Sequence, residues 1–212
     1  MERSGNGPLF FYGESHCFSQ WYRCTFQVQR SELCYLAKEE VLSRHVPLVV
    51  SFNCAEQYMM YCKAVYFGDF EIAGRILRAQ SPAEHKQCGR RVAGFDVDMW
   101  ISVREAVVES GNFAKFSQVA ECKSVLLCSG QRLLGEASGD RIWGVGLTQS
   151  ALRRQKMECG YYSLYGKNLL GEALMRVRDA LRRREEQSIA ADLENAEEEA
   201  ESQRALDVLC EG

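Results

Sequence analysis

Residues Cys54 to Phe67 (CAEQYMMYCKAVYF) are expected to form a helix that is apolar around almost its whole circumference. A helix without a polar face is normally buried, and a buried Glu or Lys is rare unless it is paired or functional. This segment nevertheless contains Glu56 and Lys63, which stand about 20° apart around the helix axis and about 10.5 Å apart along it. The two groups share one face but are too distant to pair directly. The segment therefore predicts a polar cleft in which a ligand lies between an acid and an amine.

Length and composition favour one folded domain. With 212 residues, 46% of them apolar, the chain is long enough to bury a sizeable core. Its net charge of −3 gives no overall attraction to nucleic acid or anionic membranes, so a nucleic-acid substrate would have to be recognised locally. No stretch approaches the roughly 20 apolar residues of a membrane span, and no secretory signal is evident. We therefore expect a cytoplasmic protein.

Ten cysteines and three scattered histidines, His16, His45 and His85, raise the question of a metal site or of disulfides. No CxxC pair occurs, so the spacing that binds zinc is absent. We interpret the cysteines as reduced thiols that fill core positions. Neither a metal nor a cofactor is expected.

Start and stop signals predict several helices. The clearest is the capping box Ser81-Pro82-Ala83-Glu84, with proline at the first helical position of a helix that ends near Gly89. Other helices are expected over Ser31 to Ser43, from Asp69, from Asp96 or Asp98 to Gly111, over Phe113 to Ser129 and after a cap at Asn168. Short extended segments are expected within Leu9 to Phe26, at Pro47 to Val50 and at Arg132 to Ala137.

Two segments lie outside these elements. Ser138 to Gly146 (SGDRIWGVG) is a glycine-rich loop whose backbone can turn sharply or approach a ligand. It does not follow the GxGxxG or Walker pattern, so no dinucleotide-binding fold is indicated. Residues 185–212 are acidic and alanine-rich, which is typical of a solvated helical or disordered C-terminal tail.

Five separated blocks together resemble the NADAR family of YbiA-like proteins. They are FYGESHCFSQWY at 11–22, NCAEQYMMYCKA at 53–64, GRRVAGFDVDMWISVREAVVESGNFAKFSQ at 89–118, LLGEASGDRIWGVGL at 133–147 and GKNLLGEALMRVR at 166–178. The resemblance implies an α+β fold, a compact helix-dominated single domain with a few short strands, here over residues 9–184. It also implies hydrolysis of the N-glycosidic bond of a ribosylated base. The family substrates are of two kinds: phosphoribosylamino-pyrimidine intermediates of riboflavin synthesis, and ADP-ribose attached to guanine.

The chain departs from the family pattern at two places. Between Phe26 and Asn53 it is longer than usual, which indicates an insertion over residues 27–52 that either remodels the pocket or projects from the surface. Before the GxNLLG block, Tyr165 replaces a tryptophan that is frequent in the family. This second departure weakens any transfer of substrate preference.

Cleavage of an N-glycosidic bond requires protonation of the leaving base and support for positive charge at the anomeric carbon. Glu56 and Asp140 are the carboxyl groups expected to share these catalytic tasks. Each has a plain structural alternative: a solvent-facing helix position for Glu56, and an Asx-type turn with Ser138 and Gly139 for Asp140.

Lys63 stands at the position of a family lysine that is thought to form a transient Schiff base with the ribose. A lysine desolvated among tyrosine, methionine and valine would have a lowered pKa and be partly neutral, as attack on a sugar aldehyde requires. The alternative is a snorkelling lysine that only binds phosphate.

The remaining candidates are expected to bind the substrate, and they are Trp143, Trp100, Gly13, Trp21, Arg141, Asn112 and Lys115. Trp143 lies in the glycine-rich loop, where stacking on the leaving base is a natural role. Core packing explains Trp100 at least as well, and helix capping is the default explanation of Asn112. Arg141 and Lys115 are candidate phosphate ligands, although cations of this kind are common on any surface.

The leading hypothesis is a metal-free N-glycosidase that removes ADP-ribose from guanine in a nucleotide or in nucleic acid. The preference over the riboflavin intermediates rests on the lack of a fused riboflavin-pathway domain. A second hypothesis is a module that binds ADP-ribose or a nucleotide without turnover. A third is oligomerisation through the tail, whose apolar positions Ile189, Leu193 and Ala196 are too sparse for a long coiled coil.

Overall fold

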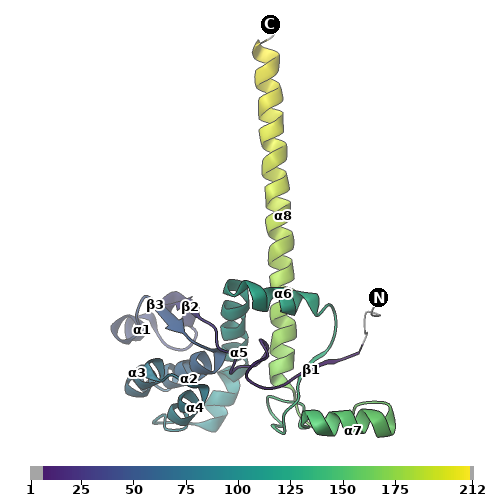
Figure 1. Cartoon of the computed structure of the whole chain (residues 1–212). Helices are drawn as coiled ribbons and strands as arrows, with labels where there is room; N and C mark the ends of the chain where they lie inside the picture. The colour runs from purple at the N-terminus through teal and green to yellow at the C-terminus, as the bar shows by residue number, and fades with distance from the viewer. Residues whose placement is uncertain (1–6, 211–212) are drawn as a thin grey trace. The chain divides into compact units, whose positions relative to one another are not determined.

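The computed structural model describes the backbone of residues 7–210 and the side chains of residues 7–197 (Figure 1). It divides into two units, one that ends at Val177 and one that begins at Arg178. Helices predominate and the strands are few and short, so the expected helix-dominated α+β class is confirmed. Among the described residues, no helix is both long enough and apolar enough to cross a bilayer.

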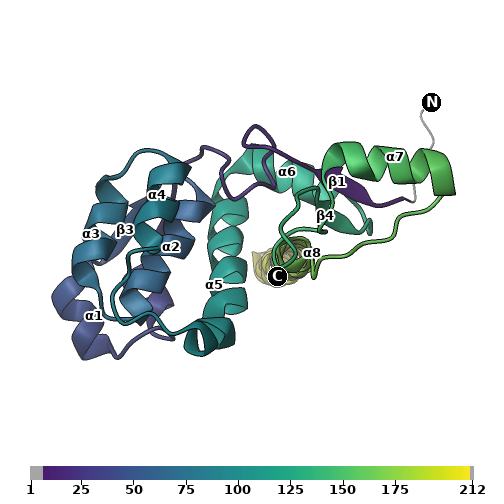
Figure 2. The ribbon, with the colours of Figure 1, turned by 90° about the horizontal axis from the view of Figure 1, so that it is seen from below.

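The first unit is organised around a buried helix, α2 (Ala55–Tyr66), which packs against α3 (Phe70–Arg78), α4 (Pro82–Gly89) and α5 (Val97–Gln118) (Figure 2). Every residue of α2 is buried except Lys63 and Tyr66. The predicted helix without a polar face is therefore confirmed. Its apolar side chains supply contacts in several directions at once, and removal of this surface from water stabilises the packing of the surrounding helices.

The helices around α2 begin at the predicted signals. The Ser81 hydroxyl accepts from Glu84 N at 3.3 Å, and the Glu84 carboxylate accepts from Ser81 N at 2.9 Å, which completes the capping box. Asp69 and Asp96 cap α3 and α5, and each accepts a hydrogen bond from the backbone N–H three residues on. These side chains satisfy donors that the first turn of a helix leaves free.

The predicted end of a helix at Gly111 is wrong, because α5 continues past it and α6 (Ala120–Cys128) follows. Gly111 lies where α5 meets α2. A Cβ atom at this position would come within 2.3 Å of Cδ1 of Tyr58. The glycine therefore permits a close approach of the two helices. The single helix predicted over Phe113 to Ser129 is likewise wrong, since Val119 adopts an extended conformation and separates α5 from α6.

Replacing Gly111 with alanine is expected to lower the free energy of unfolding by about 1–3 kcal/mol, because the added methyl group overlaps the buried Tyr58 ring. Urea denaturation followed by circular dichroism measures the change. Gly74 in α3 is the matched control: a Cβ atom there meets only Arg78 Nη1, at 3.4 Å, so Gly74→Ala should keep or raise stability through better helix propensity. Equal stability of Gly111→Ala and the parent protein would contradict this packing of α2 on α5.

Two small sheets complete the first unit. β1 (Leu9–Phe11) pairs in parallel with β4 (Leu134–Glu136), and β2 (Phe26–Gln29) pairs in antiparallel with β3 (Val49–Phe52). In the first sheet Phe11 lies opposite Glu136. The N-terminal segment after β1 and the glycine-rich loop after β4 therefore leave the same sheet side by side.

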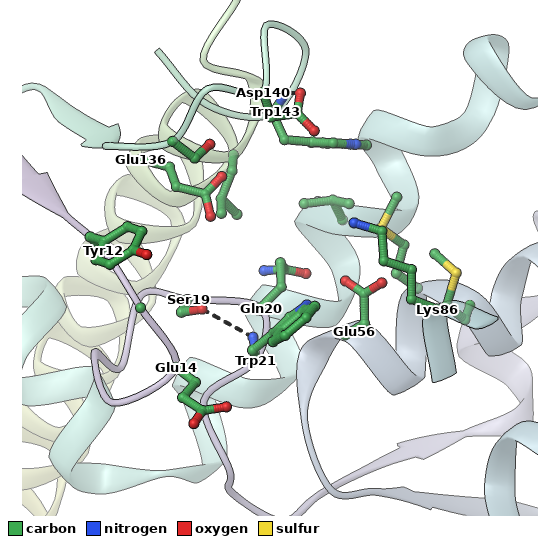
Figure 3. Close-up of a pocket in the computed structure, with 16 residues that line it drawn as sticks. Tyr12, Glu14, Ser19, Gln20, Trp21, Glu56, Lys86, Glu136, Asp140 and Trp143 are labelled. Atoms are coloured by element: carbon green, nitrogen blue, oxygen red, sulfur yellow. Dashed lines mark hydrogen bonds between the residues drawn. The ribbon is translucent and has the colours of Figure 1, made fainter. Parts of the chain in front are cut away.

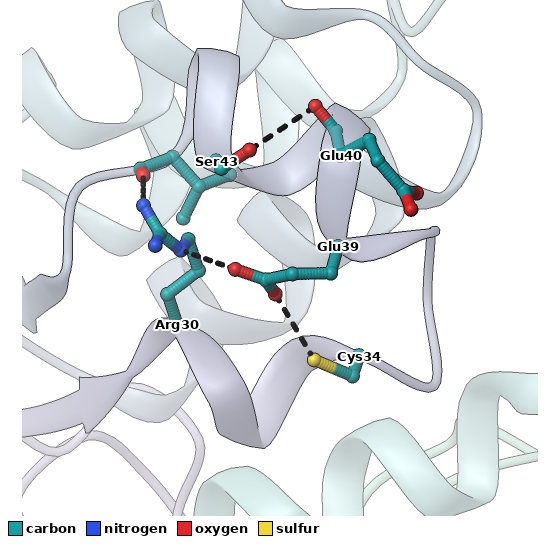
Figure 4. Close-up of polar contacts among 6 residues, drawn as sticks. Arg30, Cys34, Glu39, Glu40 and Ser43 are labelled. Carbon is teal, nitrogen blue, oxygen red and sulfur yellow. Dashed lines mark hydrogen bonds and ion pairs between the residues drawn. The ribbon is translucent and has the colours of Figure 1, made fainter.

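Residues 27–52 form an excursion composed of β2, η1 (Arg30–Leu33), α1 (Glu39–His45) and β3. The single helix predicted over Ser31 to Ser43 is wrong, because Lys38 is extended and separates η1 from α1. A polar contact joins the two helices (Figure 4): Nε of Arg30 lies 3.2 Å from Glu39, which also accepts from Cys34 Sγ at 3.3 Å.

The last two helices are α7 (Gln149–Cys159), which the sequence did not predict, and α8 (Leu169–Cys210), which begins in the first unit and continues through the second. The predicted cap of α8, Asn168, has a φ of 53°, and its side chain binds β4 instead. Its Nδ2 donates to Leu134 O at 2.8 Å, and its Oδ1 accepts from Glu136 N at 3.3 Å. Asn168 thus links the start of α8 to the edge of β4.

Candidate active site

A cavity of about 690 Å³ opens in the first unit between the N-terminal segment, α2, α4 and the loop after β4 (Figure 3). Its volume lies in the range typical of small-molecule sites. Among the sequence candidates, the residues that line it are Gly13, Trp21, Glu56, Asp140 and Trp143. Among the described residues that line the cavity, none comes from the excursion at 27–52.

Glu56 is the second residue of α2, and its backbone N donates to Gln20 O at 2.9 Å. Its side chain is only 7% exposed, so the solvent-facing alternative is excluded. Burial raises the pKa of this carboxyl to about 7. The positive charge of Lys86 and a hydrogen bond from the Trp21 side chain oppose this rise, and the negative charge of Glu136 adds to it. Near neutral pH the carboxyl is therefore present in both protonation states, which suits a group that transfers protons.

The free energy of unfolding of the Glu56→Gln variant is expected to exceed that of the parent protein by an amount that grows as pH increases. The folded pKa is about 7 and the ordinary value is 4.5, so between these limits the unfolded chain ionises first and the parent protein loses stability. Glutamine does not titrate, and the variant should gain on the order of 3 kcal/mol by pH 8.

Chemical denaturation of both proteins at several pH values tests this expectation. Glu105→Gln, at an exposed position of α5, is the control for loss of a carboxyl group. A stability difference between Glu56→Gln and the parent protein that does not change from pH 4 to pH 8 would contradict the elevated pKa.

The loop after β4 brings further carboxyl groups to the cavity. Glu136 is the last residue of β4, and burial, together with the negative charge of Asp140, raises its pKa. Asp140 forms an Asx-type turn with the residues that follow it rather than with Ser138 and Gly139: its Oδ1 accepts from Ile142 N at 2.7 Å and from Trp143 N at 3.0 Å. Both bonds use Oδ1, and the side chain also lines the cavity, so the turn and a role in the site are compatible.

Two indole rings lie on opposite sides of the cavity (Figure 3). Trp143 belongs to the glycine-rich loop, and the guanidinium of Arg104 lies 5.8 Å from its ring centroid. Nε of Arg104 is buried and has no hydrogen-bond partner among the described residues. The backbone N of Trp21 donates to the Ser19 hydroxyl at 3.1 Å. The two rings offer stacking surfaces for a flat aromatic ligand.

The expectation that Lys63 projects into the same cavity as Glu56 is not met. Lys63 Nζ donates to Gly89 O, at the end of α4, at 2.9 Å and lies 3.8 Å from the centroid of the Phe95 ring. Because Lys63 is two turns beyond Glu56, its side chain reaches this carbonyl rather than the cavity. Burial does lower the pKa of Lys63, as expected for a desolvated lysine. The amine that lines the cavity is that of Lys86 in α4.

Two other candidates, Lys115 and Asn112, form hydrogen bonds to the chain segment that makes up one wall of the cavity. Lys115 is completely buried in α5, and its Nζ donates to Cys17 O at 2.6 Å and to Ser19 O at 3.0 Å. Asn112 accepts from Gln20 Nε2 at 3.1 Å and donates to Val108 O at 2.7 Å. Neither residue lines the cavity. Both instead fix the segment that carries Ser19, Gln20 and Trp21, so the expectation of direct substrate contact from Lys115 and Asn112 is not met.

The last two candidates also lie outside the cavity lining. Trp100 is buried in α5, in agreement with core packing. Arg141 is exposed next to Asp140. Sequence reasoning missed other lining residues, chiefly Glu14, Lys86 and Glu136. Glu136 had a detectable signal, an acid within the apolar strand RLLGEA, whereas nothing in the sequence around Lys86 distinguishes it from a surface lysine.

Comparisons with known proteins show the family of the chain. The sequence signature of the NADAR domain matches residues 10–182. The chain belongs to the NADAR family. At the level of this family the chain is an N-glycosidase.

Similar proteins cover most of the chain. N-glycosidase R617 of Acanthamoeba polyphaga mimivirus is 35% identical over 178 residues, which are 81% of this chain and 94% of the relative. Protein irg-1 of Caenorhabditis elegans is 32% identical over 183 residues, 84% of this chain and 81% of the relative. The NMR structure of the E. coli protein YbiA superposes with a TM-score of 0.60 over 85% of this chain and 88% of YbiA, at 23% identity, and thus shares the fold.

Proposed function

We propose that the cavity hydrolyses the N-glycosidic bond between ADP-ribose and guanine, in a nucleotide or in nucleic acid. The observation that carries this proposal is the buried Glu56 carboxyl, whose pKa of about 7 suits proton transfer to a leaving base at neutral pH. Glu136 and Asp140 lie on the opposite side of the cavity (Figure 3). A ribosylated base between these groups would meet an acid on one side and carboxylates on the other.

The proposed reaction uses the two sides differently. Glu56 donates its proton to a ring nitrogen of the base, so that the base leaves as a neutral molecule when the bond to the sugar breaks. Positive charge develops on the anomeric carbon, and the carboxylates of Asp140 and Glu136 stabilise it electrostatically. Water then adds to that carbon and gives up a proton to a carboxylate, which yields free ADP-ribose and guanine.

The indole rings of Trp143 and Trp21 support a purine as the leaving base. Stacking of a base on an aromatic side chain contributes on the order of 1 to 3 kcal/mol. Guanine is bicyclic and offers a larger stacking face than a pyrimidine. The diphosphate would lie toward Lys86, and the positive charges of Lys86 and Arg90 are both close enough to Glu56 to oppose the rise of its pKa.

A second candidate substrate is a phosphoribosylamino-pyrimidine of riboflavin synthesis. Among the described residues that line the cavity, Lys86 is the single basic side chain. One amine suits the single phosphate group of this substrate as well as it suits a diphosphate. The choice between the two substrates therefore depends on a direct comparison of turnover.

We expect the protein to release ADP-ribose from ADP-ribosylated guanosine, and Glu56→Gln to lower kcat by a factor of about 10² to 10⁴ while substrate still binds. The rate of the parent protein should fall as pH rises above about 7, because the protonated form of Glu56 is then lost. Chromatographic detection of ADP-ribose measures both effects, with Glu105→Gln as the matched control.

The same assay with the phosphoribosylamino-pyrimidine separates the alternatives. Turnover of the pyrimidine alone would favour the second candidate substrate. Tight binding of ADP-ribosylated guanosine with no release of ADP-ribose, unaltered by Glu56→Gln, would favour a binding module without catalysis.

A covalent route, in which Lys63 attacks the ring-opened sugar before water does, is the alternative to direct addition of water and requires a movement of the Lys63 side chain. Lys63 Nζ would have to exchange Gly89 O and the Phe95 ring for the sugar aldehyde. Desolvation lowers the pKa of Lys63 and so increases its neutral, nucleophilic fraction. Lys86 is exposed and lines the cavity, which suits electrostatic binding of phosphate.

The covalent route predicts that borohydride reduction during turnover traps a sugar adduct on Lys63, detected by peptide mass spectrometry and abolished by Lys63→Arg, whereas direct addition of water predicts no adduct. Lys86→Arg should keep the adduct, since Lys86 acts only through its charge. An adduct on Lys86, or normal turnover without any adduct, would contradict the covalent role of Lys63.

A further inference from the structure

The exposed face of α7 is basic. Ala151, Leu152 and Gln155 turn toward the protein, and Leu152 packs with Ala137 and Val145. At about 100° per residue, Arg153 points away from this packed side, and Arg154 lies about 100° further around the helix on the exposed face. No ion pair in the described part of the chain involves either arginine.

This face continues into a basic segment with exposed aromatic rings. Residues 141–167 contain five Lys or Arg and one Glu, although the whole chain has a net charge of −3. Tyr161 and Tyr165 follow α7 with 64% and 60% of their surface exposed. We define the α7 surface by its exposed cations and rings, which are Arg141, Arg153, Arg154, Lys156, Tyr161, Tyr165 and Lys167.

The α7 surface is connected to the cavity by backbone hydrogen bonds. Lys167 N donates to Arg141 O at 2.9 Å, and Tyr165 N donates to Val145 O at 3.0 Å. Residues 165–170 therefore run alongside the loop that carries Asp140 and Trp143. Phe10 of β1 also packs edge-to-face on Tyr162, with ring centroids 4.9 Å apart, and α7 lies beside β1 and β4 (Figure 2). The α7 surface thus adjoins the loop that forms one wall of the cavity.

We propose that the α7 surface binds single-stranded nucleic acid and guides a modified base into the cavity. This inference rests on the proposed function, because it takes the substrate to be a base within a strand. Arginine and lysine would neutralise backbone phosphates, and the exposed tyrosine rings would stack on neighbouring bases. A base inside a duplex is inaccessible to an enclosed site, so a single strand is the form that fits.

The pattern of side chains favours nucleic acid over a membrane. A helix that lies on a bilayer buries a continuous apolar face, whereas the exposed face of α7 has Arg153, Arg154 and Lys156 around Met157. The alternation of cations with exposed rings is the arrangement found in grooves that bind single strands. The cations of the α7 surface also provide a local site for nucleic acid, which a chain of net negative charge requires.

Binding of a fluorescently labelled, unmodified single-stranded oligonucleotide, measured by anisotropy over a range of salt, tests the surface without any turnover. The double variant Arg153→Ala/Arg154→Ala should bind about tenfold more weakly, and the slope of log affinity against log salt should fall by about 1.4, since two phosphate contacts are lost. Lys38→Ala/Arg44→Ala is the matched control, because it removes the same charge from exposed positions in and just before α1, at the other end of the first unit (Figure 2).

A turnover arm connects the surface to the cavity. The Arg153→Ala/Arg154→Ala variant should lower kcat/KM about tenfold for ADP-ribosylated guanosine within a single strand, and should leave kcat/KM for the ADP-ribosylated mononucleotide unchanged. If the parent protein hydrolyses neither substrate, the proposed function fails, while the anisotropy arm still decides whether the α7 surface binds nucleic acid.

Several results would overturn the inference. They are the absence of oligonucleotide binding, an equal loss of binding in the control variant, and equally tight binding of a duplex of the same sequence. Tighter binding of phosphatidylserine vesicles than of the oligonucleotide, with the same dependence on Arg153 and Arg154, would assign the surface to membranes instead.

Discussion

The desolvation of one carboxyl group, that of Glu56, is the constraint on which the site depends. An ionised carboxylate is costly to bury, and this cost is the main reason why the pKa of Glu56 rises to about 7. The position is buried because α2 packs against α3, α4 and α5 and leaves Glu56 only 7% exposed. A helix with a solvated face at this position would leave the carboxyl ionised at neutral pH. The apolar character of α2 is therefore part of the chemistry as well as of the core.

A second layer of contacts keeps the N-terminal segment against this helix. Buried Lys115 and Asn112 use polar atoms of their side chains to hold residues 17–20, and Gln20 O in turn accepts from the backbone N of Glu56. A buried ammonium group is tolerated here because backbone carbonyls satisfy it. Residues that were candidates for direct substrate contact thus act on the cavity through the chain segment that forms its wall.

Features set by neighbouring residues in the sequence could be predicted, and features set by contacts between distant segments could not. The buried α2, its acid Glu56 and the capping box at Ser81 were predictable, because periodicity and capping are local properties. The direction of the Lys63 side chain was not, since it depends on where α4 places a free carbonyl. Gly111 resembled a helix end because the neighbouring ring that requires it lies on another helix. The helix α7 escaped prediction because, apart from Leu152, its residues form no apolar stripe.

Asn168 illustrates how a small sheet can be isolated from its surroundings. β4 pairs with β1 on one side only, so its other edge exposes backbone groups that could recruit a strand from another molecule. The Asn168 amide occupies this edge by bonding Leu134 O and Glu136 N, as a further strand would. Together with Val145 N, which donates to Glu136 O at 2.9 Å, the Asn168 side chain closes this edge of β4 to a further strand. The loop that follows β4 can then lack regular secondary structure without leaving the edge of β4 open to association with another molecule.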